Sequence, residues 1–94
     1  MRILGFDIEA SNLSADFGIV LCCGFLEVGR KTPDVLNILD YVKDGDRGDL
    51  IKAEKRLLMA MTDKLLQADV WLGHYACYYD IPFINTRLLY HHLP

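Results

Sequence analysis

A nearly unbroken apolar segment, residues 18–26, constrains the fold of this chain more than any other feature. Successive side chains of a strand point to opposite faces, so a strand that is apolar throughout indicates a sheet covered on both faces. The segment is too short to cross a membrane as a helix, because such a helix needs about 20 residues. It therefore predicts a buried β-strand in a layered α/β domain.

The rest of the chain divides into segments with strand and helix patterns. We predict strands at residues 2–9, 18–26, 35–42 and 70–73, and helices at residues 50–66 and from about Asp80 onward. Asn37 and Asp40 favour an edge position for the third strand. Asp49 is suited to cap the first helix, and Pro82 falls in the first turn of the second. The predicted order is β-β-β-α-β-α within one domain, residues 1–94.

The helix predicted over residues 50–66 has one apolar stripe that would face the core. Its members are Leu50, Leu57, Leu58, Met61 and Leu65. Charged residues between them would form the face exposed to water.

Composition narrows the class of protein. A hydrophobic share of 52% argues against disorder, and a net charge of −3 provides no basic field for nucleic acid. Bound divalent metal ions would reverse the local charge at an acidic site, so nucleic acid is not excluded. The three cysteines are an odd number, and Cys22 and Cys23 are adjacent, which favours a reducing compartment over a disulfide framework. With no signal peptide pattern, we expect a cytoplasmic protein without membrane attachment.

Asp7 and Glu9 are two carboxylates at alternate positions at the end of the first apolar strand. Because strand side chains alternate, both carboxylates share one face, and Ile8 points to the other. Like charges held this close repel each other unless a cation or bound protons compensate, and hard divalent ions prefer oxygen ligands. The pair therefore indicates a metal site; the alternative is a strand end with two solvated acids.

Asp80 follows the last predicted strand and precedes Pro82 by two residues. An acid at this position is a good helix N-cap, because its carboxylate accepts hydrogen bonds from free backbone N–H groups. The junction between a strand and a helix at the carboxyl edge of a sheet is also a favoured ligand position. The two roles are compatible, since a capping carboxylate can still offer an oxygen outward.

Three short segments carry a resemblance to a known family. Phe6-Asp7-Ile8-Glu9, Gly73-His74 and Tyr79-Asp80-Ile81-Pro82-Phe83 resemble the first two sequence motifs of the DEDD-type 3′–5′ exonucleases, which include the proofreading domains of family B DNA polymerases. The resemblance extends over residues 3–89. It implies a ribonuclease H-like fold with a mixed sheet, and hydrolysis of phosphodiester bonds at 3′ ends of single-stranded DNA or RNA.

The resemblance also implies roles for individual residues. Asp7 would bridge two Mg²⁺ or Mn²⁺ ions, Glu9 would bind the first together with water and the terminal nucleotide, and Asp80 would hold the second. Leu13 would wedge against the terminal base, or would anchor the turn in the core. The residues themselves, apart from the resemblance, suggest further contacts. Tyr78, Tyr79 and Phe83 would stack on bases or pack in the core, and Arg87 would meet either a phosphate or a carboxylate.

Two departures from the family pattern concern the activity. Tyr75 stands where the family usually has Asn, and the third motif, which would supply a fourth carboxylate, is absent: residues 85–94 contain no Asp or Glu. His91 and His92 are expected as favourable cations at a helix C-terminus, not as replacement ligands. We therefore expect a domain truncated before its last strand and helix, which binds metal weakly and hydrolyses slowly.

The alternative to an enzyme is a non-catalytic interaction domain, a degenerate or truncated nuclease. Apolar sheet surface left uncovered by such a truncation would promote association. The partners expected on this basis are a second copy of the chain or a larger polymerase or nuclease assembly.

Overall fold

The computed structural model describes residues 1–12, 18–46, 49–73 and 76–94. Its strands are β1 (Ile3–Ala10), β2 (Val20–Glu27), β3 (Asp34–Asn37) and β4 (Val70–Leu72). Its helices are α1 (Leu50–Leu66) and α2 (Ile81–Tyr90), with short 3₁₀ turns η1 (Ile38–Tyr41) and η2 (Asp44–Asp46) and a π-helical turn η3 (Ala76–Asp80). The predicted order β-β-β-α-β-α is confirmed.

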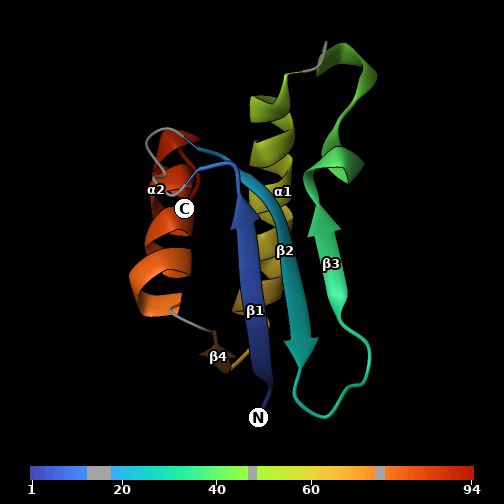
Figure 1. Cartoon of the computed structure of the whole chain (residues 1–94), viewed down its shortest axis with the longest axis vertical. Helices are drawn as coiled ribbons and strands as arrows, with labels where there is room; N and C mark the ends of the chain where they lie inside the picture. The colour runs from blue at the N-terminus through green and yellow to red at the C-terminus, as the bar shows by residue number, and fades with distance from the viewer. Residues whose placement is uncertain (13–17, 47–48, 74–75) are drawn as a thin grey trace.

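The four strands form one mixed sheet in the order β3-β2-β1-β4 (Figure 1). β1 pairs with β2 and β2 with β3 in antiparallel register, whereas β4 pairs with β1 in parallel. A parallel connection needs a crossover, and α1 supplies it between β3 and β4. β3 is an edge strand, as predicted.

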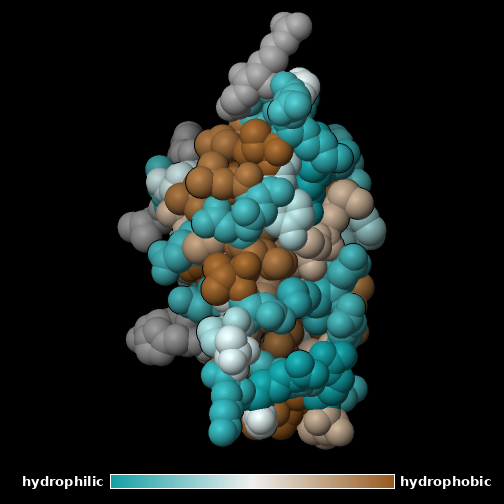
Figure 2. Space-filling view, turned by 90° about the vertical axis from the view of Figure 1, so that its right-hand side faces the viewer, coloured by the Kyte–Doolittle hydropathy of each residue, from teal (hydrophilic) through white to brown (hydrophobic). Residues whose placement is uncertain are grey.

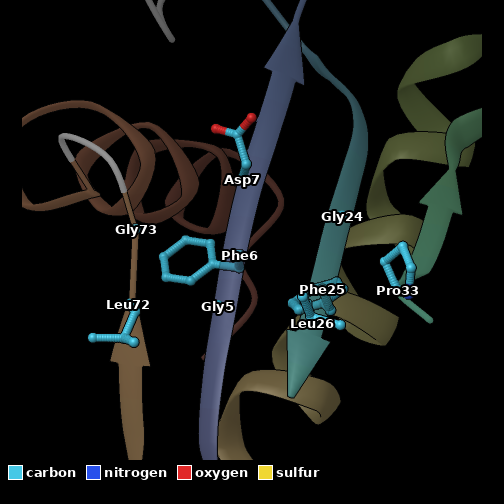
Figure 3. A pocket seen from close by; sticks show the side chains of 9 residues that line it. All are labelled: Gly5, Phe6, Asp7, Gly24, Phe25, Leu26, Pro33, Leu72 and Gly73. Carbon is cyan, nitrogen blue, oxygen red and sulfur yellow. The ribbon is translucent and has the colours of Figure 1, made fainter. Parts of the chain in front are cut away.

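The hydrophobic core lies between one face of the sheet and the two helices. Figures 1 and 3 show α1 and α2 behind the sheet, and the core joins residues of β1, β2, α1 and α2. The buried hydrophobic residues are Leu4, Phe6, Ile8, Val20, Cys23, Phe25, Ile38, Ala53, Leu57, Leu58, Met61, Leu65, Phe83 and Ile84. Alternation along β1 therefore places the intervening residues of that strand on the opposite face.

The face of the sheet away from the helices, here called the open sheet face, is exposed in the described part of the chain. It carries Gly5, Asp7, Glu9, Cys22, Gly24, Leu26, Val35 and Leu72. Leu26 is 42% exposed and Val35 is 60% exposed. The prediction that residues 18–26 are covered on both faces is therefore wrong here, because both described helices pack on the same face.

The third strand is shorter than predicted. It ends at Asn37, whose side-chain oxygen accepts a hydrogen bond of 3.0 Å from the backbone N–H of Leu39. This local bond competes with strand pairing and turns the chain into η1. Residues 38–41 are therefore a 3₁₀ turn and not the second half of a strand.

Helix α1 has the predicted bounds. Asp49 caps it, since its carboxylate accepts a hydrogen bond of 2.9 Å from the N–H of Ile51. The apolar stripe is buried from Leu57 onward, whereas Leu50 is 37% exposed. Glu54, a charged residue, is fully buried within the same stripe. In the part of the chain that the structure describes, no helix is long and apolar enough to span a membrane.

The exposed edge of the sheet carries hydrophobic side chains as well. Figure 2 looks at the side of the molecule that lies at the right of Figure 1, where hydrophobic residues gather between hydrophilic ones. Exposed hydrophobic residues of β3 and η1 include Val35 and Leu39.

Candidate functional site

Asp7 and Glu9 lie on the open sheet face in the C-terminal half of β1. Both side chains are exposed, and Ile8 between them is 4% exposed and belongs to the core. The prediction that the two carboxylates share one face is confirmed. Burial of Ile8 fixes this arrangement, because a shift of one residue would bury both acids.

Asp7 stands at one end of an open groove of about 610 Å³ on this face. Figure 3 shows the carboxylate of Asp7 directed away from Pro33 and Leu26 at the other end. Gly24 lies beside Asp7 in the register of β1 and β2, and a Cβ there would meet no atom within 4 Å. The groove is therefore shallow and accessible because glycine occupies this position.

Asp80, at the end of η3 and immediately before α2, contacts the same strand. Its side chain is buried, and its Oδ2 accepts a hydrogen bond of 3.2 Å from the N–H of Ile8. Pairing between β1 and β4 ends at Gly5 and Leu72, so the N–H of Ile8 has no partner in β4. The carboxylate of Asp80 accepts the hydrogen bond that a neighbouring strand would otherwise accept there. The backbone amide that Asp80 binds is the one between Asp7 and Glu9.

The expected capping role of Asp80 is not found. α2 begins at Ile81 as predicted, but the carboxylate of Asp80 makes no hydrogen bond that caps it. The π-helical turn η3 precedes α2, and it carries Asp80 at its end. The chain therefore uses this carboxylate to hold β1, not to begin the helix.

The three carboxylates interact electrostatically. Burial raises the pKa of Asp80 above its usual value, the negative charges of Asp7 and Glu9 raise it further, and the hydrogen bond from Ile8 opposes both. The pKa of Tyr79 is also raised, first by burial and then by the charges of Asp80, Glu9 and Asp7. A cation at this position would relieve the accumulated negative charge.

The donor set fits a hard divalent ion by its chemistry, since Asp7, Glu9 and Asp80 offer carboxylate oxygens. The side chains do not converge on one point as they stand. Among the residues that the structure describes, no three His, Cys, Asp or Glu side chains are gathered closely enough to hold a metal ion. Asp7 and Glu9 are exposed, so their side chains are free to rotate toward an ion without disturbing the core.

Two thiols lie beside the carboxylates on β2. Cys22 pairs with Glu9 across the strands and is half-buried, whereas Cys23 points into the core and is fully buried. Burial raises the pKa of Cys23 to about 12. Near the carboxylates, the thiol of Cys22 is therefore partly accessible, whereas the thiol of Cys23 is buried and stays protonated at neutral pH.

The residues predicted to contact substrate have different surroundings. Tyr79 is half-buried, its hydroxyl donates a hydrogen bond of 3.4 Å to the carbonyl of Asn12, and its ring centre lies 5.6 Å from that of Phe83. Leu13, together with His74 and Tyr75, lies outside the described residues. Of the residues predicted to contact the substrate, Tyr79 is thus described by the structure and lies close enough to Asp7, Glu9 and Asp80 for their charges to affect it.

Arg87 is 4% exposed, and its guanidinium contacts the carboxylate of Glu54 at 2.6 Å. Of the two partners expected for Arg87, the structure supplies the carboxylate, so we do not place this residue among the substrate contacts. His91 is also buried, with Nε2 2.8 Å from the same carboxylate, and His92 is exposed. His91 therefore contacts a buried carboxylate, in addition to its predicted position at the end of a helix.

Sequence reasoning missed Glu54. The signal was present, because Glu54 lies one turn before Leu57 and Leu58 on the apolar stripe of α1. A charged residue on a stripe that faces the core indicates a buried partner.

Comparisons with known proteins agree with this fold. The family model of the RNase H superfamily matches residues 4–94. The family B DNA polymerase from the hyperthermophilic archaeon Pyrobaculum calidifontis contains a similar structure, with a TM-score of 0.73 and 19% sequence identity over 100% of this chain. The match covers 12% of the polymerase chain. No curated protein sequence matches the chain.

Proposed function

This chain belongs to the RNase H superfamily, and on that premise we propose that it is the part of a metal-dependent 3′–5′ exonuclease that carries Asp7, Glu9 and Asp80. One observation carries the proposal. The carboxylate of Asp80 accepts a hydrogen bond from Ile8, the residue between the two exposed carboxylates of β1. This bond ties Asp80 to the strand that carries Asp7 and Glu9, 72 positions away from Ile8 in the sequence, and the charges of those two acids add to burial in raising the pKa of Asp80.

Each of the three acids has a distinct task in this proposal. Asp7 would hold both ions, Glu9 would hold the first together with water and the terminal nucleotide, and Asp80 would hold the second. Bound Mg²⁺ or Mn²⁺ supplies Lewis acidity for hydrolysis of a phosphodiester bond. The rigid strand β1 keeps Asp7 and Glu9 on one face, and its hydrogen bond with Asp80 limits the movement of the third acid.

The substrates proposed are 3′ ends of single-stranded DNA or RNA. Tyr79 offers an aromatic ring beside the carboxylates, and base stacking tolerates any base. Leu13 is proposed as the apolar wedge against the terminal base. We place the activity in the cytoplasm, within a larger polymerase or nuclease assembly; the thiols of Cys22 and Cys23, which form no disulfide, are compatible with a reducing compartment.

Manganese binding provides the first test. Calorimetric titration with Mn²⁺ compares the wild-type chain with Asp7→Asn and with Asp63→Asn, a control that removes an exposed acid of α1. We expect Asp7→Asn to lower the affinity at least tenfold and Asp63→Asn to leave it unchanged. Equal affinities in all three proteins would overturn the proposal.

A nuclease assay provides the second test. A single-stranded oligonucleotide labelled at its 5′ end is incubated with the wild-type chain or Asp7→Asn in the presence of Mn²⁺. We expect slow shortening from the 3′ end that depends on Asp7. Cleavage that persists in Asp7→Asn would assign the activity to another source.

A specific observation favours a second candidate function, that of an interaction domain. The open sheet face exposes Leu26, Val35 and Leu72, the last at 52%. Apolar surface of this kind promotes association with a second copy or a larger assembly. Light scattering over a concentration series tests this candidate, with Leu72→Lys as the variant expected to reduce association. A monomer at every concentration would count against self-association.

A further inference from the structure

We propose that Glu54, a fully buried carboxylate of α1, is a positioning residue for Asp80. The geometric part of this inference stands by itself, and its consequence for metal binding rests on the proposed function. Glu54, Arg87 and His91 form what we call the Glu54 cluster.

The Glu54 cluster joins three elements of the fold through one carboxylate. Arg87 on α2 donates from Nε at 3.0 Å and from its terminal nitrogen at 2.6 Å. His91, which follows α2, places its Nε2 2.8 Å from the same carboxylate. The N–H of Val20, the first residue of β2, donates to it at 2.7 Å. Glu54 is therefore the point at which α1, α2 and β2 are tied together.

The cluster sets the direction of α2, in addition to the stability that is lost when one of its members is removed. The residues of α2 that are buried are Phe83, Ile84 and Arg87. Ile81 and Leu88 pack partly against the same core. Hydrophobic contact has no preferred direction, so these apolar side chains alone define the rotation of the helix poorly. A guanidinium that contacts a carboxylate through two nitrogens fixes both distance and orientation. Because removing two charges from water is costly, such a pair is better explained by specificity than by stability.

Asp80 depends on the direction of α2 because it stands immediately before that helix. Arg87 lies two turns further along, about 10 Å at ~1.5 Å per residue. A helix is rigid over this length, so rotation at Arg87 moves Asp80 as well. The hydrogen bond from Ile8 to Asp80 is 3.2 Å long, and a displacement of about 1 Å would break it.

A second ion pair of α1 offers a matched control. Arg56 contacts Asp46 at 2.6 Å and donates to the carbonyl of Tyr41, so it ties α1 to η1 and η2 on the other side of the molecule. Loss of this pair should lower stability without moving α2.

Amide hydrogen exchange at Ile8 measures the position of Asp80 directly. The N–H of Ile8 bonds to Asp80, whereas neighbouring amides of an antiparallel strand point the opposite way, so the N–H of Asp7 faces β2. NMR on labelled protein compares the two exchange rates in Glu54→Gln, Arg87→Lys and Arg56→Lys. We expect Ile8 to exchange roughly tenfold faster relative to Asp7 in the first two variants, with the ratio unchanged in the third.

A purely structural role would have a different signature. If Glu54→Gln and Arg87→Lys accelerate exchange at Ile8 and Asp7 by the same factor, Glu54 contributes only to global stability and the inference is overturned. Arg87→Lys keeps the charge and removes the two-nitrogen contact, so it provides the decisive result if Glu54→Gln does not fold.

Mn²⁺ titration of the same variants separates this inference from the proposed function. We expect the affinity to fall in Glu54→Gln and Arg87→Lys, but not in Arg56→Lys. If Asp7→Asn binds Mn²⁺ as the wild type does while Ile8 still loosens selectively, the exonuclease proposal fails and the positioning role stands. If binding depends on Asp7 but neither Ile8 nor the affinity responds to Glu54→Gln or Arg87→Lys, the positioning role fails alone.

Discussion

The Oδ2 atom of Asp80 accepts a hydrogen bond of 3.2 Å from the backbone N–H of Ile8, a residue 72 positions away in the sequence. This bond holds a buried carboxylate against the amide between two exposed ones, Asp7 and Glu9. Burial, together with the negative charges of Asp7 and Glu9, raises the pKa of Asp80, which leads to the first prediction.

Asp80 should lower the stability of the metal-free chain as pH rises. Its pKa in the folded state is above the ordinary value of 3.8, so the folded state holds the proton more tightly than the unfolded state. Stability contributed by this group is therefore lost as pH rises from about 4 through the raised pKa. Asp80→Asn keeps an acceptor for Ile8 and removes the charge, so we expect this variant to be more stable than the wild type at pH 7.

Urea unfolding in EDTA at pH 4 and at pH 7 measures this effect. The advantage of Asp80→Asn over the wild type should be larger at the higher pH. An advantage that shrinks between pH 4 and pH 7 would contradict the raised pKa. Asp63→Asn, which changes an exposed acid of α1, controls for the loss of a charge in general.

Glu54→Ala should destabilise the fold severely. The substitution removes the carboxylate that accepts hydrogen bonds from the buried guanidinium of Arg87 and from the N–H of Val20. Loss of one partner of a buried ion pair costs about 3–5 kcal/mol. Lys55→Ala changes the neighbouring exposed residue and should alter the free energy of unfolding by less than about 0.5 kcal/mol. Urea unfolding of both variants checks the difference; similar values would show that the pair is not essential.

Gly18 and Gly24 should respond differently to alanine. A Cβ at Gly18 would lie 2.7 Å from the Cβ of Asn12 and 2.9 Å from its backbone nitrogen, whereas a Cβ at Gly24 would meet no atom within 4 Å. We expect Gly18→Ala to cost about 1–3 kcal/mol through this clash. Gly24→Ala should be neutral or stabilising by up to about 1 kcal/mol, because glycine weakens a strand. Thermal unfolding measures the stability of both variants, and equal changes in melting temperature would contradict this prediction.

Cys22 and Cys23 should differ in their reaction with iodoacetamide. The thiolate is the reactive form, and burial raises the pKa of Cys23 to about 12. We therefore expect modification at Cys22 and protection of Cys23 in the native protein at pH 7.5. Fragmentation mass spectrometry locates the label, and urea should abolish the protection. Native labelling of Cys23 at the rate of Cys22 would rule out this burial.

Features that depend on neighbouring residues could be read from the sequence. The bounds of α1 and its Asp49 cap follow from apolar spacing and a polar residue at the right position. β3 was the exception, because a bond between Asn37 and Leu39 ends the strand early and an apolar pattern continues beyond it. Side chains that bond to their own backbone compete locally with strand pairing, and hydrophobicity alone does not report this competition.

The covering of the sheet could not be read in the same way. Residues 18–26 are apolar on both faces, yet both described helices pack on the face of Cys23 and Phe25. Apolar sequence shows that burial is favourable but does not show which surface provides it. α1 lies in the crossover between β3 and β4 and α2 follows β4, and the tertiary structure places both on one face.

The sequence by itself determined the order of the elements, the shared face of Asp7 and Glu9, and the membership in a nuclease-like superfamily. These follow from periodicity and short motifs, which act over a few residues. Only the tertiary structure decided that Asp80 bonds to Ile8 instead of capping α2, and that Arg87 faces Glu54 instead of a substrate. A carboxylate or a guanidinium has several partners of similar energy, and the packing of distant segments selects among them.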